Sequence, residues 1–381
     1  MSDSSVVPET RVLAVASHVV SGYVGNKIAV FSLQSLGCDV AALNTVQFSN
    51  HTGYRQWTGS RVSAEEITEL YRGLKQSYLD DFDMMLSGYV PGAAALEVVG
   101  RIGEELKRNA VAQGRPGSFF WVLDPVMGDN GNLYVAPDVV PVYKSLVPHA
   151  DLVLPNQFEA ELLSETPITS MESIGHAIQV LHQRYAIPHV VITSVSLPHP
   201  DHPVSSLSVV GSSMTSDRRA RPFKIVFPAI DCYFSGTGDM FAALMCVRMR
   251  EAVHELDERR NKAAVDGEEG SGEGARLMDR PSWLSDDDVD ALDLPLARAA
   301  EKVLATMHEV LTKTAERMQE TVEKARARLA AAEVDGAEEG SNVEEEKKRM
   351  HLLRSKAAEL RLVRHLDSLR FPKVEFRATR L

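Results

Sequence analysis

Short apolar segments alternate with longer amphipathic segments through the first half of the chain, and this alternation leaves few folds open to it. RVLAVAS (11–17), FFWVLDP (119–125) and HVVITS (189–194) consist mainly of apolar and β-branched residues, as strands buried on both faces do. The segments 63–76 and 171–186 have the length and spacing of helices. Strands that alternate with helices usually pair in parallel. The sequence therefore predicts an α/β fold with a central, mostly parallel β-sheet and helices on both faces.

The same pattern extends to other parts of the chain. Further strands are expected at 38–46, 82–90 and 150–156, and further helices at 25–37 and 94–109. Two later apolar segments, 205–214 and 221–229, are expected as extra strands at an antiparallel edge. Near the C-terminus the sequence predicts a helix at 294–318, a charged helix at 347–369 and an alternating strand at 373–379.

Two acidic segments interrupt this pattern. Residues 251–293 contain 14 acidic and 5 basic residues, a large part of the formal net charge of −12. VDGEEGSGEGAR within this segment, and AEVDGAEEGSNVEEE further on, have a low-complexity composition that cannot build a packed core. We expect one domain, residues 1–381, with flexible acidic insertions at about 251–293 and 319–348.

Composition also limits the partners and the compartment. The acidic balance argues against a nucleic-acid partner, and no segment approaches the length of a membrane span. The cysteines, Cys38, Cys232 and Cys246, show no paired spacing, which fits a reducing compartment. We therefore expect a cytosolic protein with neither nucleic acid nor membrane as partner. The tryptophans, Trp57, Trp121 and Trp283, are expected to be packing residues.

The stretch FSGTGDMFAAL places two glycines, a threonine and an aspartate at the start of an apolar helix. A helix N-terminus presents unpaired N–H groups and a partial positive charge, and glycine lets a ligand approach the backbone closely. Gly236, Thr237 and Gly238 are therefore candidates for binding an anion. Asp239 next to them is a candidate general base for an attacking hydroxyl. The alternative for Asp239 is that it only complements the helix dipole.

Polar residues also follow several predicted strands. Asp124, with Asp129 in the loop behind it, follows one strand, and Asn156 and Glu159 follow the next. Thr193 and Ser194 end a third strand. In open α/β sheets ligands bind beyond the carboxyl ends of the strands, and carboxylates and hydroxyls suit hard cations and a triphosphate. The alternative role for each of these residues is a helix cap or a turn.

Several segments together resemble the pyridoxal kinases of the ribokinase-like superfamily. These segments are SHVVSGYVGNKIAVFSLQSLG, NTVQFSNHTGY, LSGYV, DPVMGD, PNQFEAELLS, VVITS and GTGDMFAA, in this order. The resemblance is strong over about residues 11–250 and weaker at 295–318 and near the C-terminus. It implies a ribokinase-like fold, a homodimer, and the transfer of a phosphoryl group from MgATP to the 5′-hydroxymethyl group of pyridoxal, pyridoxine or pyridoxamine.

The resemblance also implies a role for each matching residue. Asp239 would be the catalytic base, and Gly236, Thr237 and Gly238 would bind the transferring phosphoryl group. The vitamer would be bound by Ser17, Val24, Phe48, Thr52, Tyr89, Gly236 and Asp239. ATP would be bound by Asp124, Asn156, Gln157, Phe158, Glu159, Thr193, Ser194, Ile230, Asp231, Cys232 and Thr237. Asp129 would hold Mg²⁺ or another divalent ion such as Zn²⁺, and Asp124, Glu159 and Thr193 would surround K⁺ or Na⁺.

Two other functions remain open from the sequence. One is a hydroxymethylpyrimidine kinase or another small-alcohol kinase of the same fold, because the GTGD stretch and the acidic residues at strand ends would serve it equally. The other is a non-catalytic scaffold that binds partners through its acidic insertions. VQFSNHTGY argues against the first, and the joint presence of Asp239, Asp124, Asp129 and Glu159 argues against the second.

Overall fold

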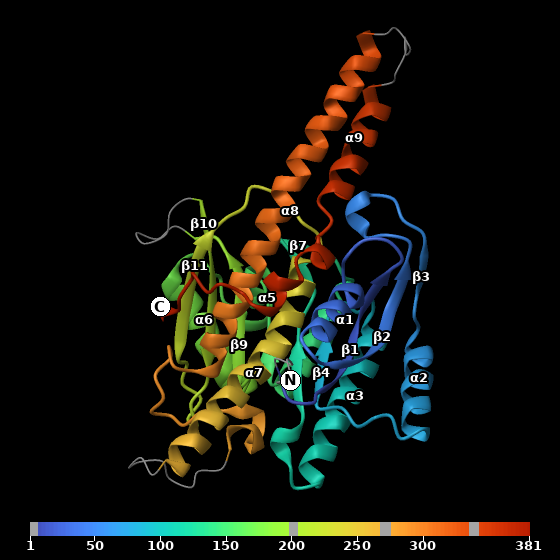
Figure 1. Ribbon diagram of the computed structural model, residues 1–381. Coiled ribbons are helices and arrows are strands. Elements are labelled where there is room, and N and C mark those ends of the chain that lie inside the picture. Colours follow the sequence, from blue (N-terminus) through green and yellow to red (C-terminus); the bar gives the residue numbers. More distant parts are fainter. Residues whose placement is uncertain (1–6, 198–204, 267–275, 335–342) are drawn as a thin grey trace.

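The computed structural model describes residues 7–197, 205–266, 276–334 and 343–381, and its centre is a large β-sheet (Figure 1). Its strands are β1 (Arg11–Val19), β2 (Asp39–Phe48), β3 (Gly59–Arg61), β4 (Met84–Ser87), β5 (Phe120–Leu123), β8 (Leu152–Val153), β9 (His189–Val195), β10 (Ser206–Ser213), β11 (Pro222–Pro228) and β12 (Thr379–Arg380). A separate hairpin pairs β6 (Gly128–Asp129) with β7 (Asn132–Leu133).

The strand order in the large sheet is β12-β11-β10-β9-β8-β5-β4-β1-β2-β3. The six strands from β9 to β2 pair in parallel with their neighbours. The outer strands β10, β11 and β12 on one side, and β3 on the other, are antiparallel. The predicted parallel sheet with an antiparallel edge is confirmed.

Helices cover both faces of this sheet. The α-helices that the structure describes are α1 (Asn26–Ser35), α2 (Ala64–Gln76), α3 (Ala93–Ala112), α4 (Val139–Leu146), α5 (Gln157–Ser164), α6 (Met171–Tyr185), α7 (Thr237–Val265), α8 (Pro295–Val334), α9 (Val343–Ala357) and α10 (Leu366–Arg370). Buried side chains of α1, α7 and α8 form one core, and those of α2 to α6 form the other. None of the described helices is long and apolar enough to cross a membrane.

Alternation along the central strands explains the two cores. Val12 and Ala14 of β1 contribute to the core with α1, α7 and α8, whereas Leu13 and Val15 contribute to the opposite core. Successive side chains of a strand point to opposite faces of the sheet. A strand between two helical layers must therefore be apolar at every position, which is the pattern that the sequence shows.

The first predicted insertion, 251–293, differs from the expectation at both of its ends. α7 continues to Val265, with Ala252 and Val253 buried. Its Asp257 carboxylate accepts hydrogen bonds from the backbone N–H groups of Leu277 at 2.7 Å and Met278 at 3.0 Å. Residues 251–265 are therefore part of a helix that begins in the core, and not of a flexible insertion. Residues 267–275 lie outside the described part of the chain.

The segment that follows, 276–293, is also packed against the fold. Trp283 is fully buried, stacks on Phe120 with ring centroids 4.1 Å apart, and donates its Nε1–H to the Gly117 carbonyl at 2.8 Å. His189 of β9 contacts the Ser282 carbonyl at 2.7 Å. The prediction of a flexible segment is wrong here because its acidic side chains face outward while a few apolar ones enter the core. Trp121 is buried as well, so the packing role expected for Trp121 and Trp283 is confirmed.

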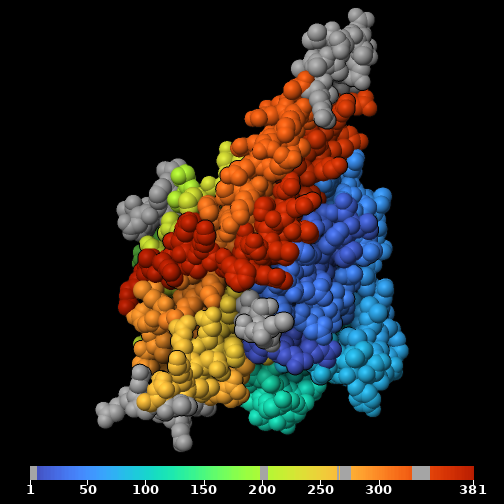
Figure 2. Space-filling model, viewed as in Figure 1, coloured from blue at the N-terminus to red at the C-terminus, as the bar shows by residue number. Residues whose placement is uncertain are grey.

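α8 and α9 project from the body as an antiparallel arm (Figure 1). They occupy the described parts of the second predicted insertion, 319–348, of which residues 335–342 lie outside the description. α9 ends at Ala357, short of the helix expected to reach residue 369, because a 3₁₀ turn at Leu362–Arg364 and the short α10 follow. Of the strand expected at 373–379, only Thr379 pairs in the sheet. The C-terminal segment runs over one face of the molecule, first beside the N-terminal third and then across α8 (Figure 2).

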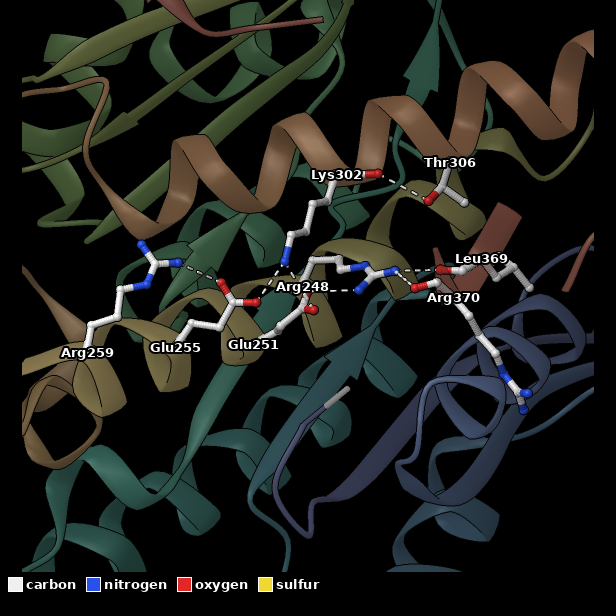
Figure 3. A network of polar contacts seen from close by, with 8 residues as sticks. All are labelled: Arg248, Glu251, Glu255, Arg259, Lys302, Thr306, Leu369 and Arg370. Carbon is white, nitrogen blue, oxygen red and sulfur yellow. Dashed lines mark hydrogen bonds and ion pairs between the residues drawn. The ribbon is translucent and has the colours of Figure 1, made fainter. Parts of the chain in front are cut away.

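A buried polar network ties this C-terminal segment to α7 and α8 (Figure 3). Arg248 of α7, 1% exposed, pairs with Glu251 at 2.8 Å and donates to the carbonyl of Leu369. Lys302 of α8 reaches Glu251 at 3.2 Å and Glu255 at 2.9 Å. A buried charge is tolerated only when it is paired and hydrogen-bonded. The network therefore fixes the path of the chain after α9.

Candidate active site

A large cleft of about 1560 Å³ opens where the parallel strands end. Ser17 and Phe48 lie near the ends of β1 and β2, Tyr89 follows β4, and Asp124 follows β5. Asn156 follows β8. The carboxyl edge of the sheet brings these residues together although they are spread over more than a hundred positions, as the topology of parallel sheets requires.

All but one of the site residues predicted from the sequence line this cleft. Those that line it are Ser17, Val24, Phe48, Thr52, Tyr89, Asp124, Asp129, Asn156, Gln157, Phe158, Glu159, Thr193, Ser194, Asp231, Cys232, Gly236, Thr237, Gly238 and Asp239. Ile230 lies in the loop after β11 and does not line the cleft.

The N-terminus of α7 opens into the cleft. Gly236 precedes the helix with a φ of +84°, and a Cβ at this position would lie 2.4 Å from the Tyr23 carbonyl oxygen. Only glycine fits this backbone conformation and this contact without strain. A Cβ on Gly238, by contrast, would meet no atom of the described residues within 4 Å. Because no side chain in the described part of the chain caps α7, its first N–H groups can bind an anion.

Asp239 lies in the first turn of this helix, half-buried in the wall of the cleft. Removal of the carboxylate from water raises its pKa, although a backbone hydrogen bond from Gly25 acts in the opposite direction. A carboxylate with a raised pKa is a stronger base than an exposed one. Asp239 therefore combines a position beside an anion-binding helix end with the proton affinity of a general base.

Asp124 and Glu159 form an acidic pair in the cleft, and the pKa values of both carboxyl groups are raised. Burial raises the pKa of Asp124 well above its usual value, and the negative charges of Glu159 and Asp239 raise it further. Burial likewise raises the pKa of Glu159 to about 7, even though three backbone N–H groups oppose the shift. Like charges this close favour either protonation or the binding of a cation. Strongly perturbed carboxylates gathered in a cleft are typical of functional sites.

Hydrogen bonds assign Glu159 a structural task as well. Its side chain accepts from the backbone N–H groups of Asn156 at 2.9 Å, Met127 at 2.8 Å and Gly128 at 3.3 Å. The Asn156 side chain caps α5, because its Oδ1 accepts the backbone N–H of Glu159, and its amide N–H donates to the Gly128 carbonyl at 2.7 Å. This capping box links the start of α5 to the loop after β5. The helix-cap role that the sequence left open for Asn156 is thus present in the structure.

The end of the cleft near β1 and β2 has a different character. Ser17, Thr52 and Tyr89 supply hydroxyl groups, and Val24 and Phe48 supply apolar walls. Burial raises the pKa of Tyr89, so its hydroxyl stays neutral and can donate a hydrogen bond. A few polar groups between apolar walls suit a small aromatic ligand with polar edges.

Trp57, His51 and Glu359 are among the residues of the cleft that the sequence did not predict as site residues. Trp57 was expected to pack, but it is 46% exposed and lines the cleft near Phe48. His51 stands in the VQFSNHTGY stretch, and Glu359 comes from the segment after α9. The VQFSNHTGY motif could have indicated that His51 belongs to the site. No sequence pattern could have indicated Glu359, because its partners lie about 300 positions away in the sequence.

The residues proposed as metal ligands share the cleft, but they do not form a closed metal site. Among the residues that the structure describes, no group of three His, Cys, Asp or Glu side chains is arranged to hold a metal ion. Both Asp129 carboxylate oxygens accept hydrogen bonds from Asn130, at 2.8 and 3.0 Å. Mg²⁺ commonly takes one or two carboxylates together with phosphate oxygens. The acidic residues therefore fit a cation that a bound phosphate helps to hold.

A doubly covered parallel sheet, an uncapped glycine-flanked helix end and an adjacent aspartate define an α/β phosphotransferase that acts on a small alcohol. A sequence model of the phosphomethylpyrimidine kinase family matches residues 99–257, which include β5, β9 and the GTGD stretch.

Comparisons with full-length proteins identify the family more narrowly. Human pyridoxal kinase is 42% identical over 250 residues, 62% of this chain and 76% of the human one. The sheep enzyme is 39% identical over 291 residues, 70% of this chain and 90% of the sheep one. The structure of pyridoxal kinase from Leishmania donovani, in complex with ADP and pyridoxamine, superposes with a TM-score of 0.71 at 27% identity, covering 98% of this chain and all of that one. The chain belongs to the pyridoxal kinase family.

Proposed function

We propose that this protein is a pyridoxal kinase that transfers the γ-phosphoryl group of ATP to the 5′-hydroxymethyl group of pyridoxal, pyridoxine and pyridoxamine. The observation that carries the proposal is the position of Asp239. This chain belongs to the pyridoxal kinase family, and its Asp239 carboxylate, whose pKa is raised, lies beside the N-terminus of α7 in the cleft at the strand ends.

Each part of the cleft has a task in this proposal. The vitamer occupies the end lined by Ser17, Val24, Phe48, Thr52 and Tyr89, with its hydroxymethyl group toward Asp239. Asp239 accepts the proton of the alcohol as the oxygen attacks the γ-phosphorus. The N–H groups at Gly236–Gly238 bind the phosphoryl group as its negative charge redistributes. Phosphoryl transfer depends mainly on such alignment and charge stabilisation.

ATP lies along the opposite part of the cleft in this proposal, with Asn156–Glu159, Thr193, Ser194, Asp231 and Cys232 around it. Asp129 helps to hold Mg²⁺ or another divalent ion, and Asp124, Glu159 and Thr193 surround K⁺ or Na⁺. A divalent ion, when bound, neutralises phosphate charge. Burial, together with the negative charges of Glu159 and Asp239, raises the pKa of Asp124, and this supports the proposal of a cation here.

The proposal includes one catalytic domain, a homodimer, and a cytosolic location in keeping with the three free cysteines, two of them buried. Sedimentation of the purified protein tests the dimer. A mass of about 84 kDa, twice the chain mass of 41.9 kDa, is the expected value, and a monomer would refute it.

A hydroxymethylpyrimidine kinase or another small-alcohol kinase of the same fold is the second candidate, because the family model that matches residues 99–257 describes a kinase of a related pyrimidine, phosphomethylpyrimidine kinase. One substrate panel separates the two. Purified protein with MgATP is offered pyridoxal, pyridoxine, pyridoxamine and hydroxymethylpyrimidine, and phosphorylated products are separated by chromatography. We expect turnover of the B6 vitamers with little turnover of the pyrimidine. The reverse order would support the second candidate, and no product from any of them would refute both.

A further inference from the structure

The segment after α9 delivers a single carboxylate to two loops that line the cleft. Glu359 Oε2 accepts the backbone N–H of Tyr23 at 2.9 Å, and Oε1 accepts the Tyr54 hydroxyl at 3.0 Å. His51 Nε2 lies 3.2 Å from the same Oε1. One side chain thus joins the loop around residues 22–24 to the turn at residues 51–54.

The geometry at these contacts is tight. A Cβ on Gly22 would lie 2.5 Å from Glu359 Oε1, so the backbone of the first loop approaches the carboxylate directly. The Glu359 and His51 side chains are only 18% and 9% exposed. Burial alone would raise the pKa of Glu359, but the contacts with His51, Tyr23 and Tyr54 together lower it. The carboxylate is therefore held in its charged form by groups from both loops.

Both loops carry residues of the cleft. Val24 and Thr52 are among the residues proposed to bind the vitamer, and His51 lines the cleft beside Thr52. The Tyr23 carbonyl packs against Gly236, at the start of the helix that bears Asp239. Glu359 contacts neither Val24 nor Thr52 through these hydrogen bonds, so its influence passes through the loop backbones.

The base from which Glu359 acts is rigid. Leu360 and Leu362 after it are buried in the core with α7 and α8. Arg248 holds the same segment further along at the Leu369 carbonyl (Figure 3). In addition, His351 of α9 contacts the Gly53 carbonyl at 3.0 Å. A side chain anchored in this way can fix the position of the more exposed loops.

We propose that Glu359 is a positioning residue that holds the 22–24 and 51–54 loops in the arrangement that receives the small-molecule substrate. This inference rests on the proposed function for the identity of that substrate. It assigns a task in the active site to the C-terminal segment, which is remote in sequence from every motif of the site.

Glu359→Ala tests the proposal, with Glu301→Ala as its matched control. Glu301 has a similar exposed fraction, 13%, and also anchors the C-terminal segment, through Arg377 and the Ala378 N–H, both at 2.8 Å. Glu301 does not line the cleft. We expect Glu359→Ala to raise KM for pyridoxal by about tenfold or more, the effect of misplaced substrate contacts, and to leave KM for MgATP within about twofold. Glu301→Ala leaves both constants unchanged.

A second readout does not depend on catalysis. Arg55 lies in an exposed position next to the 51–54 turn, so trypsin cleavage after Arg55 reports the order of this loop. We expect Glu359→Ala to accelerate this cleavage at least about fivefold, because local opening controls proteolysis. If the wild-type protein phosphorylates no vitamer while this acceleration is present, the proposed function fails and the positioning role stands.

Tyr54→Phe keeps the experiment decisive if Glu359→Ala does not fold. It removes one hydroxyl that donates to Glu359, and Tyr54 is absent from the cleft lining. We expect a rise of about threefold in KM for pyridoxal, the effect of one lost hydrogen bond. An unchanged KM for pyridoxal and an unchanged cleavage rate in either variant would overturn the proposal. So would an equal rise of KM for pyridoxal in Glu301→Ala.

Discussion

Replacement of Gly238 by alanine separates the fold of the α7 N-terminus from its function. A Cβ at this position would meet no atom within 4 Å in the part of the chain that the structure describes, and alanine is favoured over glycine in a helix by about 1 kcal/mol. Gly238→Ala is therefore expected to leave the protein as stable as the wild type or slightly more so. The new methyl group would stand where the phosphoryl oxygens approach the N–H groups, which act at distances of about 2.7–3.1 Å.

Turnover should therefore fall although stability does not. We expect a loss of at least about tenfold in kcat for pyridoxal, equal to about 1.4 kcal/mol in activation free energy. Thermal melting and initial rates on the same preparation measure the two effects. Wild-type turnover in Gly238→Ala would refute the argument that the start of α7 binds the transferring group.

Gly236→Ala is the matched control, because Gly236 lies two residues before Gly238 and has no room for a side chain. Its φ of +84° and the 2.4 Å approach of a Cβ to the Tyr23 carbonyl predict a loss of at least about 2 kcal/mol in the free energy of unfolding. Only this variant should melt earlier. Equal melting temperatures for the two alanine variants would contradict the geometry.

Two further predictions concern the stability of the fold. Burial lowers the pKa of His182 and of His189 to about 4 from an ordinary value of 6.5, so the unfolded chain binds more protons between these pH values. The contribution of these neutral histidines to the free energy of unfolding is then fully present above about pH 6.5. It declines as the pH falls toward 4, by up to about 3 kcal/mol for each histidine. A urea midpoint that does not change over this pH range would contradict the prediction. Arg248→Met leaves Glu251 with Lys302 as its ion-pair partner among the described residues, and we expect a loss of about 3 kcal/mol in the free energy of unfolding, measured with denaturant. A loss below about 0.5 kcal/mol, typical of a surface change, would show that the network carries little stability.

The parts of the fold that the sequence predicted well share one property, a strong local signal. The central strands contain runs of consecutive apolar residues. The DPVMGD stretch marks the end of β5, and the GTGD stretch marks the start of α7. The order of parallel strands then gathers the site residues at one edge. Local patterns and one topological rule were therefore sufficient to predict that Asp124, Asn156 and Asp239 lie at the same cleft.

The sequence-based predictions were wrong for segments in which most side chains are charged and face the solvent, while a few side chains face the core. The C-terminal half of α7 and the 276–293 segment are rich in charged residues, yet Asp257 and Trp283 bind them to the core. Charge counts do not show which side chains turn inward. The link from Glu359 to Tyr23 and Tyr54 was beyond reach for another reason, since it joins residues more than 300 positions apart.

Asp239→Asn most directly tests the central claim, which is that a carboxylate at the α7 N-terminus activates the acceptor alcohol. The amide keeps the shape of the side chain but cannot take up the proton. Single-turnover phosphorylation of pyridoxal, measured together with ATP binding by calorimetry, should show a rate lower by a factor of about 10² to 10⁴ with ATP affinity nearly unchanged. A rate within about threefold of the wild type, less than 1 kcal/mol in activation free energy, would contradict the assignment of Asp239 as the base.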